Sequence, residues 1–148
     1  MRTPETVYRG RRLYGPGCTI VGVEVTVNGR PLDPRASWKI VNHSPTGFEW
    51  GYSGSGPAQL ALALVLDASG NRERAERAYQ WWKSLRVSCW LKDGWEITAG
   101  QILADLDEFD RRERMRDPNY VPTVEEALGD PEGFVEGMRE ATGEGGGI

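Results

Sequence analysis

A run of apolar residues behind a glycine-rich loop constrains the fold more than any other feature of this sequence. Residues 57–69 read PAQLALALVLDAS and are apolar around nearly the whole circumference of a helix. A helix with that pattern is typical of the buried centre of a fold. We expect Ser55 or Gly56 to cap it, Pro57 to occupy the first helical position and Gly70 to end it. The core of the protein is therefore predicted to form around this helix.

Alternating residues predict strands on either side of that helix. Residues 20–27 carry valine at every second position, which gives a strand with one apolar face. Asn28-Gly29 follows directly and predicts a hairpin, because both central residues of a type I′ turn need positive φ. The return arm, residues 30–32, is expected at a sheet edge because it contains Pro31. Further strands are predicted at 6–9 and 38–41, and around a second hairpin turn at Asp93-Gly94, at 87–91 and 95–98.

Two further helices complete the predicted domain. Residues 72–85 place apolar side chains at helical spacing, with charged residues on the opposite face. Thr98 and Gln101 form a capping box, which opens a helix whose apolar face is Ile102, Leu106 and Phe109. The predicted fold class is therefore α+β, with a small antiparallel sheet of hairpins packed on a central apolar helix and further helices toward the C-terminus.

Charge divides the 148 residues into a domain and a tail. Residues 1–45 carry seven Lys and Arg against three Asp and Glu, whereas residues 117–148 carry one against eight. We predict a globular domain over 1–116. The acidic segment over 117–148 is expected to hold short helices, one capped by Thr123 with Glu126 and one starting at Asp130-Pro131, before a flexible glycine-rich end. An acidic tail argues against nucleic-acid binding by the whole chain and suits a partner with a basic surface. A solvated tail without a partner is the alternative.

The sequence predicts a cytoplasmic protein that does not enter a membrane. No apolar run approaches the roughly 20 residues that a membrane span requires, and the N-terminal residues MRTPETVYRGRR lack the apolar stretch of a signal peptide. Cys18 and Cys89 are far apart in the sequence. In a reducing cytoplasm we expect two free thiols, both mostly buried.

Residues with catalytic or metal-binding chemistry are sparse. His43 is the sole histidine, and with two separated cysteines it cannot supply a zinc site. A hydrolase would need His43 beside Ser53 or Ser55, but the G-x-S-x-G pattern of a nucleophile elbow is absent. We therefore expect no enzyme activity, no cofactor and no metal, and keep the His43–serine hydrolase as an alternative.

The glycine loop before the apolar helix is a candidate anion site. Gly54, Ser55 and Gly56 would present backbone N–H groups at the start of a helix, where anions bind. The spacing matches neither nucleotide-binding glycine pattern. The favoured interpretation is structural, with the glycines turning the chain tightly beside Trp50 and Tyr52.

Basic and aromatic residues supply candidate binding surfaces. Arg9, Arg11 and Arg12 lie between Tyr8 and Tyr14, and such a mixture of basic and aromatic residues can hold a nucleic-acid backbone and stack bases. A solvated strand end is the favoured alternative.

The sequence has six tryptophans, too many for all of them to lie deep in one small core. Trp81 and Trp82 are adjacent, so their side chains point about 100° apart on a helix. If Trp82 is in the core, Trp81 lies at its border, half-buried, or on a contact surface.

Residues 44–63, SPTGFEWGYSGSGPAQLALA, resemble the signature of an uncharacterised family of small proteins from bacteria, archaea and phages. An N-terminal Tyr8-Arg9-Gly10 and a later strand bearing Trp90 or Trp95 are similar to features of that family. The resemblance covers about residues 7–105 and implies no catalytic residues. Residues 117–148 lie outside it.

The phage members of that family lead to a functional expectation. Small phage proteins without enzymatic motifs commonly bind a host machine, and the composition, rich in arginine and tryptophan, is similar to that of thermophile-phage inhibitors of host RNA polymerase. The resemblance implies a non-enzymatic protein that docks on host machinery such as RNA polymerase. Its contact residues are expected to be Trp81, Arg9, Arg11, Arg12 and Tyr52. The alternative is a nucleic-acid or nucleotide binder that uses the arginine cluster and the glycine loop.

Overall fold

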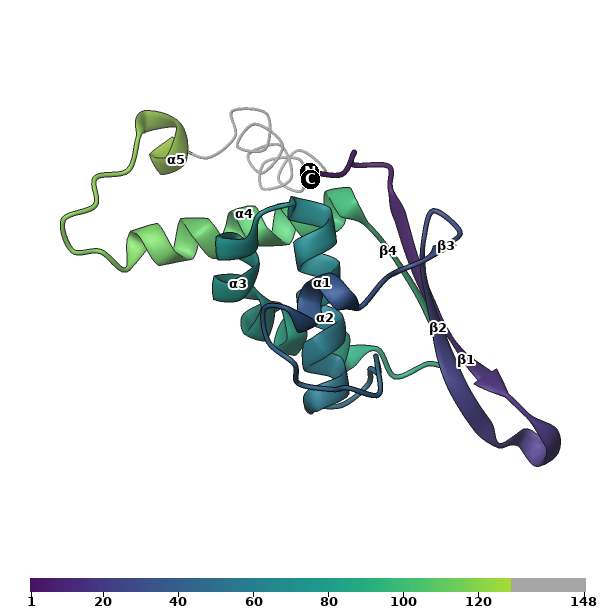
Figure 1. Cartoon of the computed structure of the whole chain (residues 1–148). Coiled ribbons are helices and arrows are strands. Elements are labelled where there is room, and N and C mark those ends of the chain that lie inside the picture. The colour runs from purple at the N-terminus through teal and green to yellow at the C-terminus, as the bar shows by residue number, and fades with distance from the viewer. Residues whose placement is uncertain (129–148) are drawn as a thin grey trace, which may run out of the picture. The chain divides into compact units, whose positions relative to one another are not determined.

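The computed structural model describes residues 1–128, and they form an α+β fold (Figure 1). The chain divides into two units, Met1–Phe109 and Asp110–Ile148. The strands, all in the first unit, are β1 Val7–Tyr14, β2 Ile20–Val27, β3 Arg30–Pro31 and β4 Gly94–Thr98. The α-helices are α1 Arg35–Trp38, α2 Ser55–Ser69, α3 Arg72–Leu85, α4 Ala99–Met115, which crosses from the first unit into the second, and α5 Val124–Leu128 in the second. Two 3₁₀ turns are η1 Pro16–Cys18 and η2 Val87–Cys89.

The four strands form one antiparallel sheet in the order β3-β2-β1-β4. Helices cover one face of it, onto which Tyr8, Val25 and Ile97 point from three neighbouring strands to join the core. The predicted Asn28-Gly29 hairpin is confirmed, with φ of 48° and 80° at the two residues. Its return arm is the edge strand β3, as expected from Pro31.

The apolar helix predicted at the centre of the core is confirmed as α2. Twelve of its fifteen residues are buried, and Leu60, Leu62 and Leu64 have no exposed surface. Gly54 is the N-cap, one residue before the expected cap, and Gly70 ends the helix in the left-handed conformation at φ 61°. The helix can be apolar on all sides because α1, α3, η2 and the core side chains of the sheet pack around it.

Two polar side chains fasten other parts of the chain to α2. Tyr8 is fully buried on β1, and its hydroxyl donates a hydrogen bond to Asp67 at 2.6 Å. Burial is the larger cause of a raised pKa of Tyr8, and the hydrogen bond to Asp67 is the second. Gln59 is also fully buried. It accepts the backbone N–H groups of His43 and Ser44 at 2.7 and 3.1 Å. Its amide donates to the Ser37 hydroxyl at 2.9 Å and the Val41 carbonyl at 3.1 Å.

Four tryptophans form a continuous chain of ring contacts through the core. Trp95 stacks on Trp90 with ring centroids 4.4 Å apart and an interplanar angle of 20°. Trp50 meets Trp95 edge-on at 5.8 Å, and Trp82 meets Trp90 edge-on at 5.9 Å. These ring contacts connect β4 and the loop that precedes β4 with α3 and with the loop before α2.

The remaining helices largely follow the sequence pattern. The bounds of α3 are those predicted, and Asn71 caps it by accepting the Arg74 N–H. Thr98 and Gln101 form the expected capping box at the start of α4, and Thr123 with Glu126 forms the one before α5. The helix predicted at Asp130-Pro131 lies outside the described residues.

The strand predicted at residues 38–41 is wrong, because the short helix α1 ends at Trp38 and the chain continues in a turn, in which the Ile40 and Val41 N–H groups bond to the Ser37 carbonyl. Asp33 accepts the backbone N–H of Arg35 at 2.9 Å, and the Trp38 N–H bonds to the Pro34 carbonyl at 3.0 Å. These local bonds satisfy the backbone without a partner strand. The first strand is also longer than predicted, since β1 continues to Tyr14 and places Arg11 and Arg12 within the sheet.

The second predicted hairpin is also wrong. Residues 87–89 form a 3₁₀ turn, and β4 pairs with β1, from Val7↔Thr98 to Arg11↔Gly94. Asp93 contacts β1 instead: its carbonyl accepts the Arg12 N–H at 2.9 Å, and its carboxylate accepts from the side chains of Arg12 and Tyr14. The two thiols are free, as expected, but both cysteines are exposed rather than buried: Cys18 lies in the β1–β2 turn and Cys89 in η2.

None of the helices within residues 1–128 combines the length and the apolar composition that crossing a bilayer requires.

Candidate functional site

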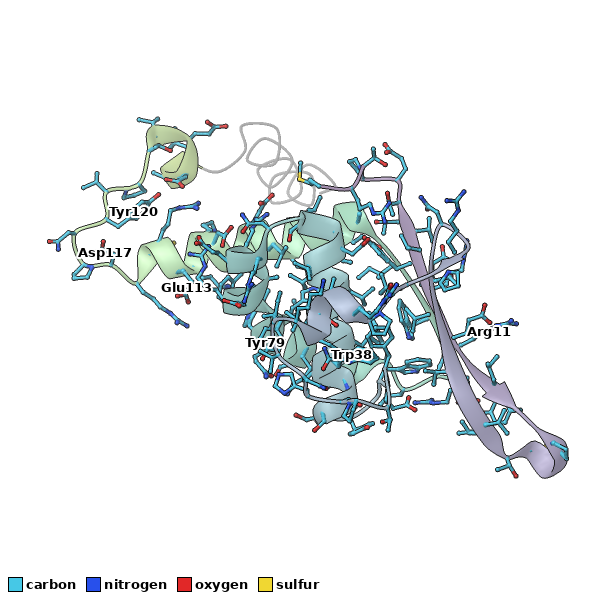
Figure 2. All side chains as sticks on the ribbon, viewed as in Figure 1. Arg11, Trp38, Tyr79, Glu113, Asp117 and Tyr120 are labelled. Atoms are coloured by element: carbon cyan, nitrogen blue, oxygen red, sulfur yellow. The ribbon has the colours of Figure 1, made fainter. Side chains whose placement is uncertain are left out.

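The outer face of the sheet, which the helices leave uncovered, carries an open hollow of about 490 Å³. Side chains alternate along a strand, so Arg9 and Arg11 point outward from β1 while Tyr8, Gly10 and Arg12 point inward. Arg11 extends away from the helices (Figure 2). We call this hollow the outer groove. It is lined by Arg9, Gly10, Arg11, Glu24, Thr26, Gly94, Trp95 and Glu96.

Two cross-strand ion pairs give the outer groove its charge pattern. Arg9 lies opposite Glu96 on β4 with a contact of 2.9 Å, and Arg11 lies opposite Glu24 on β2 with a contact of 2.6 Å. Between 39% and 70% of each of these four side chains is exposed. Exposed pairs of this kind contribute about 0–1 kcal/mol to stability, so they can be exchanged for contacts with a partner.

The floor of the outer groove depends on Gly10. The Trp95 ring packs so closely beneath it that a Cβ at position 10 would lie 2.3 Å from the indole. Trp95 is buried, and its Nε1 is, within residues 1–128, the one buried side-chain nitrogen or oxygen without a hydrogen-bond partner. The Tyr8-Arg9-Gly10 motif thus combines a core anchor, a groove arginine and a glycine that admits Trp95.

Arg12 does not share the outer groove with the other two arginines. Only 15% of its side chain is exposed, and it donates to Glu49 at 2.8 Å, to the Trp50 carbonyl at 3.0 Å and to Asp93 at 3.1 Å. Its guanidinium also lies 4.8 Å from the centre of the Trp50 ring. Burial lowers the pKa of Arg12, but the hydrogen bonds to Glu49 and Asp93 outweigh this effect and raise it overall. Arg12 therefore ties the sheet to the loop before α2.

The glycine loop borders a second hollow, of about 610 Å³, at the start of α2. Ser55 and Gly56 line it and supply N–H groups of the first helical turn, but Glu49 lines it too and brings a carboxylate. Gly54 belongs to the same turn as the N-cap, and Tyr52 is half-exposed at the rim. The glycines also serve close packing, since a Cβ at Gly56 would lie 2.7 Å from Glu49 Cβ.

Trp81 lies at the border of the core, whereas its neighbour Trp82 has no exposed surface. The Trp81 ring packs on Phe109 of α4 with centroids 5.3 Å apart. It projects from a helix on the covered side of the sheet, so it does not face the outer groove. The residues expected to bind a partner are thus distributed over separate surfaces, with only Arg9 and Arg11 together.

His43 makes its side-chain contact with Tyr79, whose hydroxyl is 2.7 Å from His43 Nε2. Across residues 1–128, no hydrogen bond joins His43 to Ser53 or Ser55. The same part of the chain contains no group of three or more His, Cys, Asp or Glu side chains arranged to hold a metal ion.

Comparison with known families identifies the chain. A family model described as a family of unknown function, DUF6166, matches residues 8–108. The chain belongs to the DUF6166 family. Comparisons with curated proteins and with solved structures found no match. The DUF6166 region begins at the core anchor Tyr8 and includes the outer groove, the glycine loop, α2 and α3. It ends within the first unit, two residues after Leu106, the last buried apolar residue of the described chain.

Sequence reasoning missed the acidic half of the outer groove in this DUF6166 protein. Glu24 occupies an outward position of the alternating segment 20–27, so its exposure could have been expected. Its place opposite Arg11 follows from the register of β1 with β2, which are joined by the turn at residues 15–19. Glu96 could not be placed in the same way, because nothing local pairs β4 with β1.

Proposed function

We propose that the protein is a binding protein without catalytic activity, and that the outer groove docks on a protein partner. The observation that supports this is the open sheet face on which two exposed Arg–Glu pairs lie beside each other. Such a surface suits a partner with acidic and basic side chains in alternation, because each of the four charges can contact its opposite. Charge complementarity of this kind steers encounter and selects the partner.

The carboxylates favour a protein over a nucleic acid as the partner. Glu96 and Glu24 lie within contact distance of Arg9 and Arg11, so each arginine that could bind a phosphate has a negative charge next to it. A protein surface that binds nucleic acid gains affinity from positive charges that no neighbouring carboxylate compensates. A protein surface of mixed charge meets no such repulsion.

Host machinery such as RNA polymerase is the partner we propose to test first, with the protein acting in the host cytoplasm. The motivation is the resemblance to small phage proteins that redirect host machines. The acidic segment 117–148 would add attraction to a basic surface on the same complex.

An affinity purification from host lysate with a charge-swapped variant tests this proposal. In the double variant Arg11→Glu/Glu24→Arg the intramolecular pair and the net charge are retained, but the charges that a partner meets are exchanged. The matched control, Arg72→Glu/Glu76→Arg, swaps an exposed pair on α3, away from the sheet. We expect the wild type and the control to recover the same protein complex and the outer-groove variant to lose it.

Two results would overturn this reading. Equal recovery by all three proteins would mean that the outer groove is not the docking surface. Recovery that disappears after nuclease treatment and falls steeply with salt would instead support a nucleic-acid binder.

A further inference from the structure

The β1–β2 hairpin extends beyond the helices that cover the rest of the sheet (Figure 1). Large apolar side chains on this extension are open to solvent: Tyr14 is 49% exposed, Ile20 50% and Val21 65%. A bulge at Val21, where the register with Leu13 and Tyr14 shifts, contributes to that exposure. The hairpin thus carries apolar surface that the first unit does not cover.

The outer edge of β2 along this extension has no backbone partner. β3 pairs only with Thr26 and Val27, and the Leu32 N–H adds one bond to the Val25 carbonyl. Within residues 1–128, no backbone hydrogen bond reaches Ile20–Glu24 from the side opposite β1. Because the antiparallel ladder alternates, the N–H and C=O groups of Val23 point outward with those of Val25.

Natural sheets protect such edges with lysine, proline, an inward-pointing charge or a bulge, and the bulge in this strand is at Val21, next to the turn into β1. The segment Ile20–Val25 reads IVGVEV and contains neither lysine nor proline. Its one charge, Glu24, is on the outer face and is paired with Arg11. A second strand could therefore add to this edge without bringing uncompensated like charges together.

We propose that two copies of this chain pair through the outer edges of their β2 strands to form one continuous sheet. In an antiparallel arrangement about a two-fold axis near Gly22, Val21 of each copy lies opposite Val23 of the other. The outward backbone groups of Val23 gain partners, and the exposed Val21 loses contact with water. Gly22 leaves the centre of the interface open, since no atom lies within 4 Å of the position a Cβ would take.

The oligomeric state of the full-length protein tests this proposal. Light scattering after gel filtration should give twice the mass of one chain, with dissociation on dilution. Val21→Lys places a charge at a position that is exposed in the single chain, so it should leave the fold intact by circular dichroism and give a monomer. Val21→Thr keeps the β-branched shape and should retain the dimer.

Hydrogen exchange at the Val23 amide separates this dimer from one formed through another surface. The amide should be protected in the dimer and exchange faster in the Val21→Lys monomer. A wild type that is monomeric at every concentration, a Val21→Lys variant that stays dimeric, or a dimer with an unprotected Val23 amide would each overturn the proposal.

Discussion

Gly10 and Trp95 are coupled through a single close contact between neighbouring strands. The indole of Trp95 occupies the space that a side chain at position 10 would need, and the ring then continues the tryptophan chain into the core. Position 10 therefore requires glycine because of the space that Trp95 occupies, and not because of its backbone conformation, which is that of an ordinary strand.

Gly10→Ala should lower the free energy of unfolding by about 1–3 kcal/mol, because the new methyl group forces a rigid buried ring to move. The measurement is urea denaturation followed by tryptophan fluorescence. Gly94→Ala is the matched control, since its Cβ would meet the Gly10 carbonyl oxygen at an ordinary 3.5 Å. Equal losses from the two substitutions would contradict the steric explanation.

Gln59 holds residues 37–44 to α2 through four hydrogen bonds made by one buried amide. Gln59→Leu should lower the free energy of unfolding by about 2–4 kcal/mol, because two backbone N–H groups lose their acceptor and each unpaired buried group costs about 1–3 kcal/mol. Gln80→Leu, at an exposed position on α3, should change it by no more than about 0.5 kcal/mol. Chemical denaturation of both variants gives the comparison.

At the scale of elements, α1 shows how a carboxylate starts a helix of four residues. The Asp33 carboxylate accepts hydrogen bonds from the side chain and from the backbone N–H of Arg35, and these hydrogen bonds lower the pKa of Asp33 to about 2. Because the folded-state pKa is below the ordinary 3.8, the contribution of Asp33 to stability is present above that pH. It is lost as the pH falls toward 2.

A carbon-13 titration of the Asp33 carboxyl should therefore give a pKa of about 2. In Arg35→Gln the side-chain contact is lost, and the pKa should rise toward its ordinary value. A wild-type pKa near 3.8 would show that α1 begins without this contact in solution.

Local chemistry accounts for the elements that the sequence predicted well. Asn28-Gly29 specifies its own turn, and residues 72–85 contain a complete helix with a cap in Asn71, so no distant residue is needed to place them. The partner of β4 is a distant one, since it pairs with β1, and Asp93 next to it contacts Arg12 and Tyr14 of that strand. The outer groove was half-predicted for the same reason: Arg9 and Arg11 belong to one strand, whereas Glu24 and Glu96 come from its two neighbours.

At the scale of the whole molecule, the apolar core is confined to one part of the chain. Every buried hydrophobic residue of the described region lies between Tyr8 and Leu106. The family match covers nearly the same range, residues 8–108. Stability should therefore be concentrated in the N-terminal part of the protein.

A chain of residues 1–116 should unfold with the same urea midpoint and slope as the full-length protein, because it keeps every apolar residue that is buried within residues 1–128. This tests the domain boundary predicted from the charge distribution. A lower midpoint would mean that residues 117–148 contribute to the stability of the domain. A lower slope would mean that less surface is buried on folding.

The ring contacts from Trp50 through Trp95 and Trp90 to Trp82 also provide a spectroscopic signal for the folding of the protein. Two indoles stacked at 4.4 Å with nearly parallel planes couple their electronic transitions, and that coupling depends on the separation and angle of the rings. Because the four rings belong to segments that meet only after folding, a strong near-ultraviolet circular dichroism signal should arise when the sheet docks on the helices. The far-ultraviolet signal follows helix formation, so secondary structure and tertiary packing can each be observed in one unlabelled sample.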